Sequence, residues 1–258
     1  MRYLLGVKLN GIDLAGLDGK IYVEDIIEEL ASALEASPML GGGQFCHGIT
    51  RDSMKITVKV MIKARRRDER ADIIGKIFAW AAEGYLAVSY RPGKRIYARC
   101  TELPKTEAWD WTQRLEIVFT AFGRACWEDT EYASVTVTGS TQARTSFRPK
   151  GTLDCRLEAE VTNVSEENVT SLKLFCPQGY IELDGIEVAP GDTVTFGYDK
   201  YGILFIECDG ESLLPFRTAE SADELVLKRS ENPNHIELCR CVTDQSCTTV
   251  FKARWLYR

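Results

Sequence analysis

The chain has 258 residues, of which 45% are hydrophobic and 27% charged, the balance of a soluble globular protein rather than of a disordered or membrane-embedded one. This length favours two domains of ordinary size. Lys and Arg number 20 against 19 Asp and Glu in residues 1–145, and 12 against 19 in residues 146–258. No broad basic stripe results, which argues against a protein that reads nucleic acid.

The N-terminus MRYLLGVKLNGIDL has too short an apolar run for a secretory signal. No stretch approaches the roughly 20 apolar residues that cross a bilayer. The nine cysteines are odd in number and scattered, which suits a reducing compartment and small buried apolar side chains. We therefore expect synthesis in the cytoplasm and no membrane association.

The first 62 residues predict strands around one ambiguous segment. Residues 3–9 alternate loosely and run into Asn10-Gly11, which is typical of short strands joined by tight turns. Residues 23–37 carry Ile26, Ile27, Leu30 and Leu34 at helical spacing and precede Pro38 and Gly41–Gly43. We expect a helix there. Residues 54–62, MKITVKVMI, alternate as a half-buried strand does.

One amphipathic helix is predicted after the basic run Arg65–Arg67. Asp68 is the expected N-cap and Gly84 the expected stop. Residues on the predicted apolar face are Ile73, Ile74, Ile77, Phe78 and Ala81. Residues 85–103 then indicate two strands around an Arg-Pro-Gly-Lys turn, and QRLEIVFTAF indicates another strand.

The remainder of the chain predicts a sandwich. A segment rich in Ser, Thr and Gly follows Trp127, and from Gly151 onward short alternating runs recur at intervals of about 8 to 12 residues, with turns at Asp184-Gly185 and Asp209-Gly210. The fold class is mainly β (α+β): an N-terminal β-barrel or sandwich-like domain with one principal helix over residues 1–130, a connecting segment over 131–150, and a C-terminal β-sandwich over 151–258.

The sequence contains residues of the types that bind metals or act in catalysis, but their spacing does not match that of a known kind of site. His47 and His235 lie far apart in sequence and lack companions for a metal or a general base. The triplet Cys239, Cys241 and Cys247 does not have the C-x2-C spacing of structural zinc sites, and Cys239 and Cys241 should share one face of a strand. We expect no metal and no cofactor.

Catalysis has equally little support. The acidic pairs Glu28-Glu29, Glu166-Glu167 and Asp223-Glu224 are more typical of solvated turns than of glycosidase carboxylates. Arg65–Arg67 indicates a solvated or interface charge run. No nucleotide-binding, nucleophile-elbow or zinc-protease motif occurs, and Gly41–Gly43 lacks the following Lys-Ser/Thr of a phosphate loop. We predict that the chain is not an enzyme and has no catalytic, cofactor-binding or metal residues.

Trp109-Asp110-Trp111 joins two predicted strands. Paired aromatic residues in a loop can stack on sugar rings, anchor a protein partner, or simply pack under the loop. A carbohydrate-binding module therefore stands as an alternative hypothesis, and a cell-wall hydrolase as a weaker one, because no acid and base pair stands out.

Taken in order, several segments resemble the distal tail protein (Dit) family of phages with long non-contractile tails. They are the glycine-rich loop and strand of residues 41–62, the helix that ends at Trp80 with the hairpin YLAVSYRPGKRIYARC, the strand LEIVFTAFGRACWED, and, in the second half, VTNVS, SADELVLKRSENPNHIEL and VFKARWLYR.

The resemblance implies a galectin-like C-terminal domain and a homo-hexameric ring, possibly in paired rings, at the tail tip of the virion. It implies as partners the tail tube protein, the tape measure protein, and a tail-associated lysin or receptor-binding protein. The loop Gly41–Gly43 is then a candidate intersubunit arm, because ring closure covers strand edges that would otherwise be exposed.

Overall fold

The computed structural model describes residues 5–38, 44–102, 106–109, 111–122, 125–199 and 202–258, and only the backbone of 31–38, 44–52, 106–109 and 122. The chain forms two compact units, divided between Trp127 and Glu128. Strands make up most of the described chain, and α1 (Arg67–Trp80) is its one α-helix. The predicted mainly β fold class is therefore confirmed. No helix in the described ranges has the length and apolar character needed to cross a bilayer.

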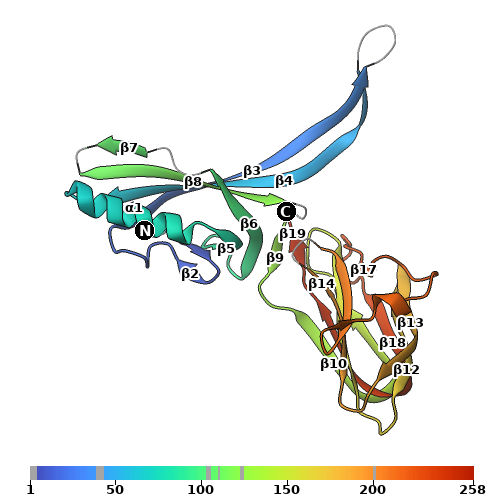
Figure 1. Cartoon of the computed structure of the whole chain (residues 1–258). Coiled ribbons are helices and arrows are strands. Elements are labelled where there is room, and N and C mark those ends of the chain that lie inside the picture. Colours follow the sequence, from blue (N-terminus) through green and yellow to red (C-terminus); the bar gives the residue numbers. More distant parts are fainter. Residues whose placement is uncertain (1–4, 39–43, 103–105, 110, 123–124, 200–201) are drawn as a thin grey trace. The chain divides into compact units, whose positions relative to one another are not determined.

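The first unit is built around one antiparallel sheet (Figure 1). Its strands follow the order β2-β1-β5-β6-β8-β4-β3, with β7 also beside β8. Their bounds are β1 (Val7–Leu9), β2 (Ile12–Asp13), β3 (Ile21–Pro38), β4 (Gln44–Lys63), β5 (Glu83–Val88), β6 (Lys94–Glu102), β7 (Thr106–Trp109) and β8 (Thr112–Phe122). The short strand β9 (Trp127–Asp129) follows at the boundary of the unit.

The core of this unit comes from the alternation seen in the sequence. Ile56 on β4 lies opposite Phe119 on β8, and Val58 lies opposite Ile117. All four side chains are fully buried. Burial of each large apolar side chain contributes about 1.5–3 kcal/mol, so the pairing of β4 with β8 holds the centre of the sheet together. The predicted Arg-Pro-Gly-Lys turn joins β5 to β6, with Gly93 at a φ of +71° that favours glycine.

The prediction of a helix over residues 23–37 is wrong, because this segment is part of the strand β3. Its backbone pairs with β4 from Ile21, opposite Ile62, to Pro38, opposite Gln44. The helical spacing of four apolar residues was a local signal, whereas the hydrogen-bonded ladder with β4 is a tertiary one. A tertiary ladder of this length overrides local propensity.

The helix α1 packs on the sheet through Ile73, Ile77 and Trp80, which are buried. Phe78 is 40% exposed, so its predicted place on the apolar face is wrong. Asp68 is inside the first turn rather than at the N-cap, which is Arg66, and Gly84 lies in β5 beyond the helix end. The Trp80 ring meets Phe119 edge-on at 5.9 Å and its indole N–H donates to the Ile12 carbonyl at 3.0 Å.

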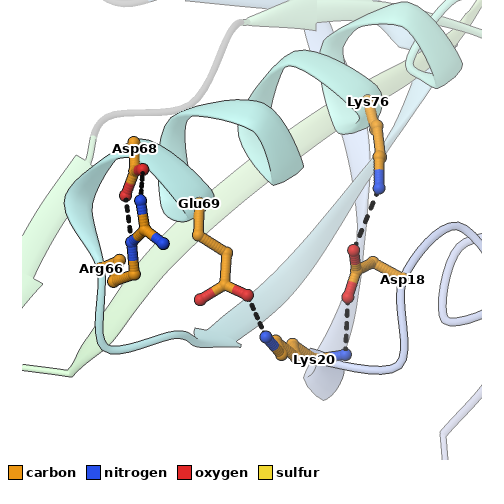
Figure 2. A network of polar contacts seen from close by, with 6 residues as sticks. All are labelled: Asp18, Lys20, Arg66, Asp68, Glu69 and Lys76. Carbon is orange, nitrogen blue, oxygen red and sulfur yellow. Dashed lines mark hydrogen bonds and ion pairs between the residues drawn. The ribbon is translucent and has the colours of Figure 1, made fainter.

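Charged side chains on the outer surface tie α1 to the turn that precedes β3 (Figure 2). The Lys76 ammonium lies 3.1 Å from an Asp18 carboxylate oxygen, and Glu69 pairs with Lys20. The other Asp18 oxygen accepts the backbone N–H of Lys20 at 3.2 Å. The hydrogen bond from Lys76, together with that from Lys20, holds the pKa of Asp18 below its ordinary value despite slight burial.

We expect replacement of Asp18 by Ala to destabilise the protein by less than about 1 kcal/mol, because exposed ion pairs are screened by water. The loss should shrink further in 1 M salt, where the Debye length falls to about 3 Å. Urea unfolding of the variant at low and high salt would measure both effects, and a salt-independent loss would contradict an electrostatic origin.

The second unit is an antiparallel sandwich. Its strands follow the order β13-β12-β18-β11-β14-β15-β16, with β10 beside β18 and β17 beside β11. The bounds are β10 (Ala133–Phe147), β11 (Cys155–Asn163), β12 (Val169–Cys176), β13 (Gly179–Val188), β14 (Thr193–Tyr198), β15 (Leu204–Cys208), β16 (Glu211–Ser212), a 3-10 turn η1 (Leu214–Phe216), β17 (Val226–Leu227), β18 (Glu237–Ala253) and β19 (Leu256–Tyr257).

The strand β18 organises this unit. Its first part pairs with β12, from Arg240 to Thr243, and its last part pairs with β11, from Cys247 to Ala253. Alternate residues of β11 and β18 are buried, including the fully buried Phe251. The predicted C-terminal sandwich is therefore present, with its core between the inward faces of these strands.

Two local predictions in this half are wrong. Residues 133–147 of the expected connecting segment form the strand β10, because they pair with β18 along most of its length. Asp184-Gly185 is not a turn between strands but a bulge inside β13, where the register with β12 shifts. Asp209-Gly210 does form the tight turn between β15 and β16, with both residues at positive φ.

Candidate assembly surface

The most unusual feature of the first unit is the far part of the hairpin β3–β4 (Figure 1). β4 pairs with β8 only from Ser53, opposite Phe122, to Lys63, opposite Thr112. Beyond this point, residues 31–38 of β3 and 44–52 of β4 pair with each other alone among the described strands. We call these two segments the ribbon. A two-stranded hairpin is marginal in water without a further layer or strand.

The base of the ribbon is fixed by a half-buried carboxylate on β3, that of Glu28. Arg91 pairs with Glu28 through two nitrogens, with Nη2 to Oε2 at 2.8 Å and Nε to Oε1 at 3.0 Å. The Tyr90 hydroxyl also donates to Glu28, and the indole N–H of Trp127 donates to Oε2 at 3.1 Å. The Arg91 guanidinium lies 5.1 Å from the centre of the Trp127 ring. These contacts join three segments of the first unit: β3, the turn after β5, and the end of the unit at Trp127.

These contacts set the ionisation of the cluster. Burial alone would raise the pKa of Glu28, but the hydrogen bonds from Arg91, Tyr90 and Trp127 together hold its pKa below the ordinary value. Burial and the neighbouring Glu28 carboxylate both raise the pKa of Tyr90. Glu28 is therefore a carboxylate and Tyr90 a neutral donor at neutral pH, which is the combination of charges that the hydrogen bonds require.

The cysteines of the sequence-predicted metal candidate lie inside the sandwich. Cys239, Cys241 and Cys247 are all buried on the inward face of β18. Burial raises the pKa of Cys239 and of Cys241 to about 12 in each case. A thiol with such a pKa stays protonated at neutral pH, and only the thiolate is a good metal ligand or nucleophile. This agrees with the interpretation of these residues as small apolar core residues.

The structure separates the remaining candidates. His235 contacts the buried Glu237 at 2.6 Å, whereas the side chain of His47 lies outside the described residues. Glu28 belongs to the cluster at the ribbon base, and the other acidic candidates are exposed or in ion pairs: Glu29, Glu166, Glu167, Asp223 with Arg217, and Glu224 with Arg156. The structure brings no two of these pairs into a common cluster within the described residues.

The aromatic loop of the sequence is exposed in its described part. Trp111 is 60% exposed, and Arg65 lies over its ring at 5.0 Å. Asp110, the side chain of Trp109 and the loop Gly41–Gly43 lie outside the described residues. Arg66 pairs with Asp68, and Arg67 is an exposed residue at the start of α1. The basic run is thus divided among an aromatic contact, an ion pair and solvent.

Among the described residues, one group of three brings possible metal-ligand atoms within 4.8 Å of one another: Asp192, Cys208 and Asp209. Asp209 is exposed. Burial, together with the nearby carboxylates of Asp209 and Asp192, raises the pKa of Cys208. The thiol therefore keeps its proton, and this surface group has the character of a charged turn rather than of a built metal centre.

Sequence reasoning missed two features of the first unit, the ribbon and the Glu28 cluster at its base. Glu28 was visible only as an acidic residue within an apolar run, and the ribbon was hidden by the helical spacing of residues 23–37. Residues 24–29 run as acidic and apolar doublets, so this part of the segment carries no period-two signal for a strand.

No protein-family model matches the chain, and no curated protein matches it by sequence. Solved structures do match. The crystal structure of the Dit protein (gp 19.1) of phage SPP1, described as a paradigm of the hub adsorption apparatus in phages that infect Gram-positive bacteria, is 11% identical, with a TM-score of 0.69 over 97% of this chain and 99% of that one. A chain of the phage P2 baseplate in its activated conformation with Ca is 10% identical, with a TM-score of 0.50 over 97% of each chain.

The fold of this chain is therefore one that it shares with these solved phage hub and baseplate proteins. More specifically, it is a β-rich Dit-like fold that extends over nearly the whole chain. The resemblance stated from the sequence is confirmed at the level of the fold.

Proposed function

We propose that the chain is a structural hub protein at the tail tip of a phage or prophage with a long non-contractile tail. In this proposal six copies form a ring that joins the tail tube to the tip proteins, and two rings can pair. The tail tube protein, the tape measure protein and a tail-associated lysin or receptor-binding protein are the proposed neighbours. The protein would have no enzymatic activity and would be made in the host cytoplasm before assembly into the virion.

The observation that carries this proposal is the ribbon. Residues 31–38 and 44–52 extend past the sheet as two strands whose outer edges pair with no other strand in the described part of the chain. Exposed strand edges favour pairing with another chain, and copies arranged around a closed ring can supply such a partner repeatedly. The Dit-like fold supports the same role, since the solved structures that share it are hub and baseplate components.

Native mass spectrometry and electron microscopy of the purified full chain test the proposal. We expect hexamers or paired hexamers, and images of rings with a central channel. A protein that stays monomeric at concentrations of several hundred micromolar, roughly the range in which weak protein contacts form, would refute it.

Carbohydrate binding by the second unit has less support. The exposed Trp111 belongs to the first unit, and Arg65 covers one approach to its ring. A galectin-like shape does not by itself imply sugar binding. Glycan arrays and calorimetry with cell-surface polysaccharide would decide, and detectable binding would restore this alternative.

A further inference from the structure

The second unit has a long free edge at β10. Ala133–Phe147 pairs with β18 and, in the described part of the chain, with no other strand. The residues at its start, ASVTVTGSTQA, carry neither a charge nor a proline. Proteins usually protect an exposed edge by charge, proline, short length or a bulge. Here only the irregularity after Val137, where the register with β18 shifts, interrupts the edge. The start of β10 therefore presents unprotected backbone donors and acceptors to another strand.

The regular part of this edge consists of residues 133–137, which pair with β18 without interruption. Val135 is the middle residue and lies opposite the fully buried Phe251, yet its own side chain is 38% exposed. Val135 is therefore at the rim of the sandwich core, on the side where β10 has no further strand among the described residues. A strand added to this edge would remove its apolar surface from water, which is favourable.

This segment matches itself when a second copy is placed about a twofold axis at Val135. Antiparallel pairing then puts Val135 opposite its own counterpart. The other facing pairs are Ala133 with Val137 and Ser134 with Thr136. Each pair combines either two apolar side chains or two hydroxyl groups, and both kinds of pair stabilise an antiparallel ladder. The edge is therefore self-complementary, and no charge lies within it.

Charge selects a second copy of β10 over other edge strands of the chain. β3 has Glu24, Asp25, Glu28 and Glu29 in one short stretch, and β7 and β16 each contain a glutamate. These carboxylates would meet no basic partner on residues 133–143, because that stretch is uncharged. An uncharged strand that alternates small apolar and hydroxyl side chains fits this edge better, and β10 is itself such a strand.

We propose that residues 133–137 of β10 pair antiparallel with the same residues of a second copy, about a twofold axis at Val135. The contact joins the sheets of two sandwiches into one and covers both free edges. The proposal rests on the proposed function and deepens it: neighbours within a ring meet head-to-tail, whereas this self-complementary contact links copies of two rings. Such a short pair of strands is weak alone, so repetition of the contact around the paired rings gives it strength.

Disulfide trapping in the full chain tests this contact. A cysteine on the axis faces its own counterpart at a Cα separation of about 4.5–5.5 Å, within the range of a disulfide. We expect V135C to form a covalent dimer on mild oxidation with copper phenanthroline about tenfold faster than the unchanged protein, whose Cys100 and Cys208 are partly exposed. The control V137C places the two cysteines about 13 Å apart along the strands, beyond the reach of a disulfide. It should dimerise no faster than the unchanged protein, whereas A133C/V137C should again form dimers, because these two positions face each other.

A charge on the axis gives a second readout. V135K puts two ammonium groups opposite each other, so native mass spectrometry and electron microscopy should show single rings in place of paired ones. T138K makes the same change in net charge at an exposed position outside the paired segment and should leave pairing intact, with the circular dichroism of both variants that of a folded β protein. Failure of V135C to dimerise, equally fast dimerisation of V137C, or normal pairing of V135K would each overturn this contact while leaving a ring possible. Trapped V135C dimers in a protein that forms no rings would instead overturn the proposed function and leave the contact.

Discussion

Replacement of Phe119 by Ala is expected to destabilise the first unit by about 3–5 kcal/mol, the usual cost when a large aromatic residue is removed from a packed core. Phe119 is fully buried on β8, lies opposite Ile56 on β4, and meets the ring of Trp80 edge-on. Its loss would leave a cavity between the centre of the sheet and α1. Urea unfolding followed by tryptophan fluorescence and circular dichroism measures the change.

Phe78 to Ala is the matched control for this experiment. Phe78 lies on α1 but is 40% exposed, so the same truncation should cost less than about 1 kcal/mol. Equal losses in the two variants would show that α1 does not pack on the sheet through the face described above.

Replacement of Glu28 by Ala is expected to lower the free energy of unfolding by about 1–3 kcal/mol, because it removes one side of a half-buried, hydrogen-bonded ion pair. The variant removes the carboxylate to which the Arg91 guanidinium donates two hydrogen bonds. It also removes the acceptor of the Tyr90 hydroxyl and of the Trp127 indole N–H. Glu102 to Gln is the control, because Glu102 forms an exposed pair with Lys55 and such pairs contribute about 1 kcal/mol or less.

The same carboxylate should give stability a defined pH dependence. The pKa of Glu28 is lower in the folded protein than its ordinary value, so its contribution is fully present above the ordinary glutamate pKa of about 4.3. It is lost as the pH falls through the lowered folded pKa. Comparison of E28Q with the unchanged protein between pH 6 and pH 3 should show the difference in unfolding free energy narrowing toward the acid end. A difference that is constant over this range would contradict the assignment.

Much of the fold was predictable because its signals are local. The alternation of residues 54–62 and of the run QRLEIVFTAF corresponds to β4 and β8, and the helix face through Ile73 and Ile77 packs as predicted. The apolar residues of each of these segments have the spacing of a strand or of a helix, but not of both. The local pattern and the tertiary contacts therefore favour the same secondary structure.

The errors arose where a long-range contact decided the outcome. Residues 23–37 are helical by spacing but form β3 because β4 offers a ladder along their whole length. Residues 133–147 are rich in Ser and Thr, a composition that predicts a connection, yet β18 pairs with them. The position of Arg144 on β10 opposite Arg240 on β18 was equally out of reach, because the two residues meet only through the register of strands almost a hundred residues apart in sequence.

The buried thiols of the sandwich have a practical consequence for handling the protein. Burial disfavours the thiolate and raises the pKa of Cys239 and of Cys241 to about 12, so both thiols stay protonated at neutral pH. Oxidants and alkylating reagents react with the thiolate of an accessible cysteine. These two side chains should therefore stay unmodified in aerated buffer for as long as the sandwich is folded. The rate at which these two cysteines are alkylated therefore measures the rate at which the second unit unfolds.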